Sequence, residues 1–297
     1  MNGTIYCIGD AMVDVIVELG EEINLGSDTQ SKISMVGGGA AANTSCWLAH
    51  QGLSVRFIGK VGSDAAGRQF IAELERFGVH HGELTVEGAT TGMVVVLVDK
   101  RGERTMFPDP GANNLLSAGD LPALDGVSGV FISGYSLYKE QSEDAILKII
   151  EKVRSANIPL IFDPASVGPM RNFGREKVLA ILNSVDCLIL NRDEARFLAD
   201  NDDVAFAARF LHQRVATVII KLGGDGAIGI DTQEEIIQSP SVATKVLDTT
   251  GAGDAFAAGF LPLWLNDRQL KPALDSGNLL ASQCVAILGA RPRVNAG

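Results

Sequence analysis

The segment Asp248-Thr-Thr-Gly-Ala-Gly-Asp254 places three small residues and a carboxylate at the start of a predicted helix. Free backbone N–H groups and the positive end of the helix dipole can hold an anion there, and Gly251, Ala252 and Gly253 are small enough to let a phosphate approach. Asp254, in the first turn, could accept a proton from an alcohol. The segment therefore predicts phosphoryl transfer to an alcohol, although an acidic residue that simply favours a helix start is the alternative.

Polar residues also follow the strands of the second half of the chain. Three predicted strands run directly into polar or glycine-rich positions, namely Ile158–Phe162 into Asp163, Val185–Leu190 into Asn191 and Glu194, and Val218–Leu222 into Gly223, Gly224 and Gly226. In an open α/β sheet, ligands bind beyond the carboxyl ends of the strands. These ends are therefore expected to converge on one ligand-binding crevice.

From about residue 127 onward, strand-like and helix-like segments alternate. Val127–Ser133 is a further apolar run, and helical spacing of apolar residues follows over 142–155 and 204–213. This βαβ rhythm predicts a mostly parallel central sheet flanked by helices.

The first third of the chain is richer in strands. Val13–Leu19 and Met93–Val98 are predicted strands, and a turn at 100–103 leads into a returning strand over Arg104–Phe107. We expect these pieces to form a small β-rich lid, from about 13–36 and 91–108, within a single catalytic domain of residues 1–297.

Composition limits the partners and the compartment. The net charge of −11 argues against nucleic acid and anionic membrane surfaces, which clustered Lys and Arg normally bind. The four cysteines are far apart and form no C-x-x-C pair, so neither a zinc site nor a disulfide framework is expected. The start of the chain shows no export signal, and no apolar stretch is long enough to cross a membrane. A cytoplasmic protein is expected.

Several motifs in a fixed order resemble the ribokinase-like (PfkB) carbohydrate kinases. The D-T-x-G-A-G-D segment looks like their C-terminal signature, and the glycine-rich segments 37–43 and 59–67 look like their N-terminal one. G-D-x-x-x-D at 9–14, N-x-x-E at 191–194 and Gly289-Ala290 extend the similarity over essentially the whole chain. The resemblance implies a ribokinase-like fold and transfer of the γ-phosphate of ATP to a sugar or sugar-like alcohol, with Asp254 as general base and Gly251–Gly253 as the anion hole.

The resemblance also assigns binding roles. Substrate hydroxyls would be bound by Asp14, Gly38, Gly39, Asn43 and, from the lid, Arg104. ATP would lie along Asn191, Lys221, Gly223, Gly226 and Asn278, and Glu194 would hold Mg²⁺ through water. A monovalent cation, K⁺, would bind beside the anion hole at Asp248, Thr250 and Gly289. Taken singly, most of these residues read equally well as turns, caps or solvated charges. A homodimer through the lid is a further expectation.

The substrate stays open at this stage. Ribokinases proper carry a lysine in their G-G-K-G-A-N segment, where this chain has Gly39, so ribose does not follow from the resemblance. The segment Phe107–Pro110, with Tyr135 and Tyr138, would suit a sugar, a sugar acid or a nucleoside. A nucleoside kinase of the same family is the main alternative.

Two other classes of function are more distant alternatives. Gly224-Asp-Gly-Ala-Ile-Gly229 matches the G-x-G-x-x-G pattern of NAD-dependent oxidoreductases, but that pattern should open a helix in the first βαβ unit, and here a strand is predicted late in the chain. No G-x-x-x-x-G-K-[ST] phosphate loop occurs. A non-catalytic sugar-binding regulator would need no carboxylate beside an anion hole, which makes Asp254 the discriminating residue.

Overall fold

A computed structural model describes residues 3–293 of the chain. Its main body is built on a nine-stranded sheet. The strand order is β15-β14-β13-β12-β11-β10-β1-β4-β6. Its strands are β1 Thr4–Ile8, β4 Val55–Ile58, β6 His80–His81, β10 Val127–Ser133, β11 Leu160–Asp163, β12 Cys187–Asn191, β13 Thr217–Lys221, β14 Ala227–Ile230 and β15 Ile237–Ser239.

The sheet is parallel from β6 to β13, and β14 and β15 add to it antiparallel. The strands predicted over 127–133, 158–162, 185–190 and 218–222 correspond to β10, β11, β12 and β13. The fold class predicted from the sequence, a mostly parallel sheet flanked by helices with a smaller β-rich part, is confirmed.

Helices cover both faces of this sheet. On one face lie α1 Ala40–His50, α2 Ala65–Arg76, α8 Ala252–Asp267 and α9 Leu270–Val285; on the other lie α3 Glu140–Ser155, α4 Val167–Phe173, α5 Arg175–Leu182, α6 Arg192–Ala199 and α7 Val204–His212. Successive strand residues alternate between the two cores, so Ile5 and Cys7 enter one and Tyr6 and Ile8 the other. Each fully buried large apolar side chain contributes about 1.5–3 kcal/mol, which makes this body a rigid support for the strand ends.

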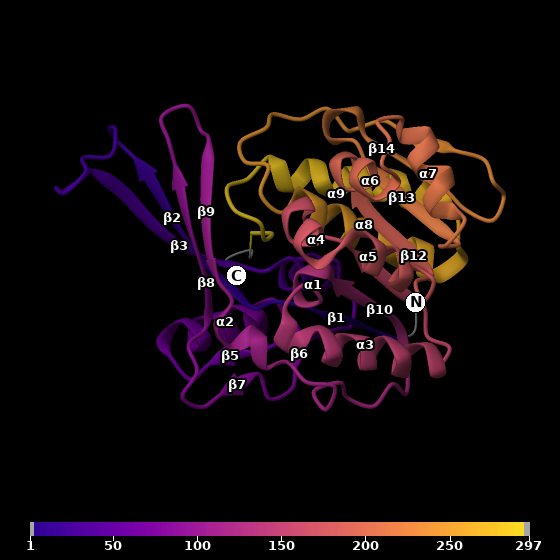
Figure 1. Cartoon of the computed structure of the whole chain (residues 1–297), viewed down its shortest axis with the longest axis horizontal. Coiled ribbons are helices and arrows are strands. Elements are labelled where there is room, and N and C mark those ends of the chain that lie inside the picture. Colours follow the sequence, from indigo (N-terminus) through magenta and orange to yellow (C-terminus); the bar gives the residue numbers. More distant parts are fainter. Residues whose placement is uncertain (1–2, 294–297) are drawn as a thin grey trace.

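A separate four-stranded sheet, which we call the small sheet, has the order β3-β2-β8-β9. It consists of β2 Met12–Leu19, β3 Ser31–Gly38, β8 Gly92–Val98 and β9 Arg104–Asp109, and it projects from the main body at the left of Figure 1. The segments predicted as the lid, 13–36 and 91–108, lie in it. Two short strands, β5 Val61–Gly62 and β7 Thr85–Val86, pair with each other in parallel and form a third sheet.

The register of the small sheet assigns its residues to two faces. Asp14 pairs with Val94, which pairs with Pro108, and Arg104 is four residues before Pro108 on the same strand. Because side chains alternate along a strand, Asp14 and Arg104 share one face. Ile33, Met35 and Phe107 lie on the opposite face.

No helix within residues 3–293 is both long enough and apolar enough to cross a bilayer.

Candidate active site

The helix α8 begins at Ala252, immediately after a left-handed turn at Gly251. Gly251 has a φ of 76°, and a Cβ atom there would lie 2.6 Å from the Cα of Ala290. Any larger residue would therefore be strained at this position. The N–H groups of Gly253 and Asp254 have no hydrogen-bond partner among residues 3–293, whereas that of Ala252 donates to the carbonyl of Thr249 at 3.3 Å. The helix start therefore has free N–H groups that could bind an anion.

Asp254 lies in the first turn of α8 and is held by a residue from α1. Its Oδ2 accepts a hydrogen bond of 2.9 Å from Nδ2 of Asn43. Burial raises the pKa of Asp254 to about 7 in spite of that hydrogen bond, and the negative charge of Asp163 adds to the effect. A carboxyl with a pKa near 7 is well matched to accept a proton at neutral pH.

A buried arginine near the end of the chain orients Asn43. Nε of Arg291 donates to Oδ1 of Asn43 at 3.1 Å, Nη2 donates to the carbonyl of Gly38 at 2.9 Å, and Nη1 lies 2.8 Å from a carboxylate oxygen of Glu73. Arg291 is only 7% exposed. With its Oδ1 fixed by Arg291, the amide of Asn43 must present its NH₂ group to Asp254. The sequence did not identify Arg291, because a lone arginine beside Ala290 carries no local signal of these contacts.

Asp14, on β2, faces the glycine-rich segment that precedes α1. A Cβ atom at Gly38 would lie 2.3 Å from Oδ1 of Asp14, so glycine leaves room for the Asp14 carboxylate in this position. Burial raises the pKa of Asp14 to about 6, and the positive charge of Arg291 acts in the opposite direction. Among residues 3–293, no donor forms a hydrogen bond with this carboxylate. A partly buried, unpaired carboxylate is suited to accept hydrogen bonds from ligand hydroxyls.

Lys221 lies beside the anion-binding turn. Its Nζ donates to Oδ2 of Asp163 at 2.8 Å, and a Cβ atom at Gly253 would lie 3.1 Å from the same Nζ. The ammonium group, at the end of β13, is thus next to the start of α8. Asp163 is 6% exposed and ends β11, so the predicted meeting of strand ends brings a buried ion pair to the turn.

Asn191 and Glu194 form a capping box at the start of α6. Both carboxylate oxygens of Glu194 accept from Asn191, one from its backbone N–H at 2.8 Å and one from Nδ2 at 2.5 Å. Glu194 is 1% exposed, and burial, with Asp163 adding to it, raises the pKa of Glu194 to about 7. The contacts of Glu194 in this structure are those of a helix cap, and they leave its predicted contact with the waters of Mg²⁺ a prediction.

The remaining residues predicted for ATP surround the β13–β14 hairpin. Gly223 is exposed in the turn, whereas Gly226 is buried, and a Cβ atom there would lie 2.1 Å from the carbonyl oxygen of Ser239. Asn278, 6% exposed, uses its NH₂ group to hold Ser239 and Pro240. Gly226 and Asn278 therefore have structural roles here. The G-x-G-x-x-G pattern runs into a strand, β14, rather than a helix, as predicted.

Asp248, Thr250 and Gly289 do come together. One carboxylate oxygen of Asp248 accepts from the N–H and the hydroxyl of Thr250, and the other accepts from the N–H of Gly289 at 3.0 Å. Arg104 joins this group, because its Nη2 donates to Asp248 at 2.7 Å, and its predicted contact with substrate stays a prediction. Burial alone would raise the pKa of Asp248, but the bonds from Arg104, Thr250 and Gly289 lower it to about 2.

Asp10 forms a second buried cluster near the carboxyl end of β1. Its carboxylate accepts from Oγ of Ser136 at 2.7 Å and from Nζ of Lys139 at 2.5 Å. Tyr135, 37% exposed, lies close enough to Asp254 that the carboxylate adds to the effect of burial, which raises the pKa of Tyr135 to about 12. Neither Asp10 nor Lys139 was among the predicted site residues.

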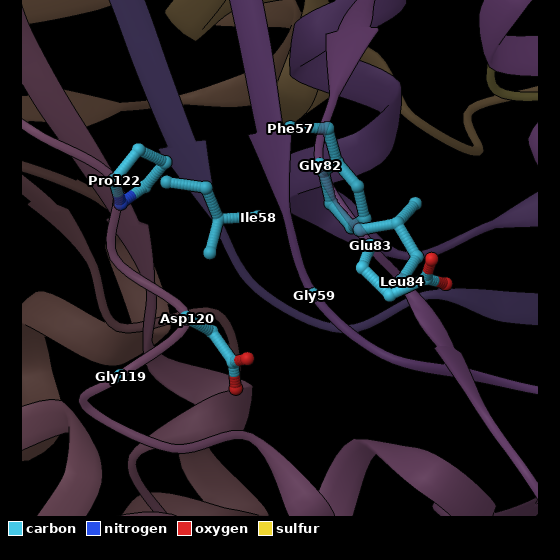
Figure 2. A pocket seen from close by; sticks show the side chains of 9 residues that line it. All are labelled: Phe57, Ile58, Gly59, Gly82, Glu83, Leu84, Gly119, Asp120 and Pro122. Atoms are coloured by element: carbon cyan, nitrogen blue, oxygen red, sulfur yellow. The ribbon is translucent and has the colours of Figure 1, made fainter.

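Two cavities lie outside this constellation. One of about 270 Å³ opens beside the end of β4 and is lined by side chains such as Phe57, Leu84, Asp120 and Pro122 (Figure 2). The other, of about 550 Å³, includes Thr217, at the amino end of β13, and Trp264. None of the predicted site residues lines either cavity. The candidate site is therefore defined by its polar residues at the strand ends.

Comparisons with known proteins agree on one family. The model of a family described as pfkB family carbohydrate kinase matches residues 2–295. An uncharacterized sugar kinase from Archaeoglobus fulgidus is 31% identical over 247 residues, which is 82% of this chain and 96% of that protein. Pseudouridine kinase from Escherichia coli is 30% identical over 273 residues, which is 88% of this chain and 84% of that enzyme.

Solved structures give the same result for the fold. A probable sugar kinase from Rhizobium etli superimposes with a TM-score of 0.89 at 24% identity, covering 98% of this chain and 96% of that one. Ribokinase from Arabidopsis thaliana, complexed with ribose and ATP, superimposes with a TM-score of 0.83 at 27% identity, covering 98% and 95%. With the family model, the relatives and the fold in agreement, this chain belongs to the pfkB family of carbohydrate kinases and is an ATP-dependent enzyme of that class.

Proposed function

We propose that this enzyme transfers the γ-phosphate of ATP to a hydroxyl group of a neutral sugar or sugar-like acceptor, with Asp254 as general base. The observation that carries the proposal is the position of Asp254, one residue after the Gly251–Gly253 turn. Its carboxylate is partly buried, and burial raises its pKa to about 7. A base for an alcohol and an anion hole for a phosphoryl group are thereby adjacent.

In the proposed reaction, Asp254 accepts the proton of the acceptor hydroxyl while the oxygen of that hydroxyl forms a bond to the γ-phosphorus of ATP. The bond from that phosphorus to the bridging oxygen of ATP breaks, and ADP leaves with the electron pair. The N–H groups at the start of α8 and the ammonium of Lys221 face the developing negative charge. Positioning and charge stabilisation supply most of the rate enhancement in such transfers.

Mg²⁺ typically accompanies ATP in this chemistry and neutralises charge on the phosphates. Within residues 3–293, no cluster of three or more His, Cys, Asp or Glu side chains is arranged to hold a metal ion. A Mg²⁺ ion that arrives with ATP and keeps most of its waters fits this arrangement. Each carboxylate oxygen of Glu194 accepts one hydrogen bond from Asn191 and keeps a second lone pair, with which it could accept from a water of such an ion.

The charges around the site favour a neutral acceptor. The cations near the strand ends each have a carboxylate partner, as in the pairs Arg291–Glu73, Lys139–Asp10 and Lys221–Asp163. Among residues 3–293, Asp14 and Asp254 form no ion pair, so the unpaired charge at the site is negative. A sugar acid or a sugar phosphate would add another negative charge and would be repelled.

A nucleoside acceptor is the second candidate, and Tyr135 favours it. This ring is 37% exposed near Asp254, where it could stack against a planar base while Asp14 accepts hydrogen bonds from the sugar. The relatives include a protein named pseudouridine kinase, and one structural neighbour is an adenosine kinase from Sinorhizobium meliloti at 25% identity. Tyr135→Ala should lower kcat/KM for a nucleoside more than for a free sugar.

One experiment tests the acceptor. ADP formation is measured with Mg²⁺ and a panel of neutral pentoses and hexoses, nucleosides, 2-keto-3-deoxy acids and sugar phosphates. We expect the highest kcat/KM with a neutral polyol or nucleoside. Turnover confined to the anionic acceptors would overturn the charge argument, and failure of every acceptor would remove the proposed function.

Dimerisation through the small sheet is a further part of the proposal. Its outer face carries Ile33, Met35 and Phe107, which are 65%, 47% and 55% exposed, and apolar side chains on one face of a sheet normally need a partner. A second copy of the chain would cover them. Sedimentation of wild type and of Met35→Lys tests this, since the variant should be monomeric.

Two predictions from the sequence remain beside this proposal. The four cysteines are buried and free, as expected for a reducing cytoplasm, and that compartment stays a prediction. The requirement for K⁺ also stays a prediction. Arg104 already contacts Asp248 and would compete there with a bound ion.

A further inference from the structure

Arg104 is the first residue of β9 and connects the small sheet to the loop that precedes α8. Its Nη1 donates to Oγ1 of Thr250 at 2.5 Å, and its Nη2 donates to Oδ1 of Asp248 at 2.7 Å. The side chains of Arg104 and Asp248 are 34% and 11% exposed. Two hydrogen bonds from one planar guanidinium fix its orientation as well as its position.

Asp248 is the centre of three segments. It receives the guanidinium of Arg104 from the small sheet, the N–H and hydroxyl of Thr250 from its own loop, and the N–H of Gly289 from the C-terminal turn. Thr250 immediately precedes Gly251, whose left-handed turn aims the first N–H groups of α8. A change at Arg104 can therefore shift the carboxylate of Asp248, which holds Thr250, and Thr250 is directly bonded to Gly251 at the start of the anion hole.

The register places Arg104 away from the acceptor. Asp14 and Pro108 lie at the same level of the small sheet, and Arg104 is four residues from Pro108 along β9. At about 3.3 Å per residue, Arg104 is roughly 13 Å from the level of Asp14. Its partner in this structure is the loop before α8.

We propose that Arg104 is a positioning residue that acts as a built-in cation for Asp248, so that closure of the small sheet orders the Gly251–Gly253 turn. This inference rests on the proposed kinase function. It makes a bound monovalent cation unnecessary at Asp248, because the guanidinium supplies the positive charge there. The anion hole is then fully ordered only when the small sheet lies against it, which couples closure to catalysis.

Steady-state kinetics of Arg104→Ala, in K⁺ and in tetramethylammonium buffers, test the proposal. Wild type should have the same kcat in both buffers. Arg104→Ala should lose about tenfold in kcat in tetramethylammonium, with KM for ATP changed less than about twofold, because the guanidinium orders the turn rather than binding ATP. K⁺ or added guanidinium should restore part of the loss, and Arg104→Lys should retain more activity than Arg104→Ala.

Arg101→Ala is the matched control. Arg101 lies in the turn between β8 and β9, and its one partner among residues 3–293 is Asp99. Its removal therefore takes the same charge from the same hairpin without touching Asp248. It should have the kcat of wild type in both buffers. A similar loss in both variants would mean that the net charge of the hairpin matters, and would overturn the proposal.

Three results would contradict it. If Arg104→Ala increases the KM for ATP at unchanged kcat, Arg104 is a phosphate ligand. If K⁺ activates wild type as much as it activates Arg104→Ala, Arg104 does not act as the cation at Asp248. If Arg104→Ala and Asp248→Asn have additive effects on kcat, the two residues act separately. Coupled effects on kcat are expected.

Hydrogen exchange separates this inference from the proposed function. In the protein without substrates, amides of residues 249–254 should exchange faster in Arg104→Ala than in Arg101→Ala, because only the first variant frees the loop. Equal exchange would overturn the contact even if the kinase is active. If no acceptor of the panel is phosphorylated but exchange differs as expected, the proposed function fails and the role of Arg104 in ordering the loop stands.

Discussion

The strand ends of the main sheet and the small sheet differ in how firmly their residues are held. At the strand ends, Asn43, Asp163 and Glu194 are 5%, 6% and 1% exposed, and each has fixed hydrogen-bond partners. Along the small sheet, every residue of β9 is exposed. The first arrangement fixes its side chains, whereas β9 has few buried contacts to keep it in one position. We therefore expect the chemistry at the rigid strand ends and movement in the small sheet.

The largest expected effect comes from Asp254→Asn, which removes the base from the rigid part. Asn keeps the size of the side chain but cannot accept the proton of the alcohol, so kcat should fall by about 10²–10⁴ while ATP binding survives. Both kcat and the melting temperature are measured on the same preparation. If Asp254 only favours the start of α8, the variant keeps near-normal kcat and loses up to about 1 kcal/mol of stability.

Arg291→Met tests whether the support of the site is as rigid as its burial indicates. The change leaves Glu73 without its ion-pair partner and leaves the carbonyl of Gly38 and Oδ1 of Asn43 without their donor. It should cost about 3–5 kcal/mol of unfolding free energy. Arg104→Ala, at a partly exposed pair, should cost about 0–1 kcal/mol. Urea unfolding measures both. Arg293→Met, at an exposed position two residues on, is the control, and a loss for Arg291→Met no greater than this control would make the comparison wrong.

The pH dependence of activity should follow Asp254. With its pKa raised to about 7 by burial, kcat/KM should fall about tenfold for each pH unit well below 7, because the protonated carboxyl is not a base. The assay is kcat/KM from pH 5 to pH 9. A flat profile between pH 5 and pH 8 would exclude Asp254 as the group that titrates.

Stability should depend on pH in the opposite sense. The ordinary pKa of the carboxyl is 3.8, and burial raises it to about 6 at Asp14 and about 7 at Asp254. Between about pH 4 and pH 7 the folded state therefore binds more protons than the unfolded state, so the contribution of these groups to the unfolding free energy falls as pH rises. Asp254→Asn should flatten this decline in urea unfolding measured at several pH values, and an unchanged slope would contradict it.

The smallest effect concerns the small sheet itself. Saturation with an acceptor should slow amide exchange in 13–36 and 91–108 by several fold, because closure excludes water from a part with few buried contacts. The core strand β12 should be unaffected and serves as the internal reference. Unchanged exchange in both segments would show that the small sheet does not close, and the contrast between the two regions would lose its dynamic meaning.

Much of the main sheet was predictable because its strands are buried on both faces. The apolar runs of β10, β12 and β13 stand out without any alternation, and α3 shows the spacing of a helix with one buried side. The strand β4 has only four residues and contains Arg56, so neither signal identifies it. Local patterns thus reveal an element when its length and burial are typical.

The site was only partly predictable, for a different reason. The residues of the start of α8 are neighbours in the sequence, and their chemistry can be read together. Asn43 and Arg291 are 248 residues apart, and Arg104 and Asp248 are 144 apart. No periodicity encodes such contacts, because they depend on how whole elements pack. Hence the contact of Arg104 with Asp248 was not foreseen, its predicted substrate contact stays a prediction, and Arg291 was missed.

The contacts of Arg291 also bear on how the protein is made. Arg291 fixes Asn43 and Gly38, which are synthesised 248 and 253 residues before it. Closing so long a loop is an entropic cost that is recovered only after Arg291 has been made. A nascent chain can assemble the sheet from β1 onward, but Asn43 lacks this partner until Arg291 has left the ribosome. Chains that stop short of residue 291 should therefore fold with Asn43 unoriented and with lower activity.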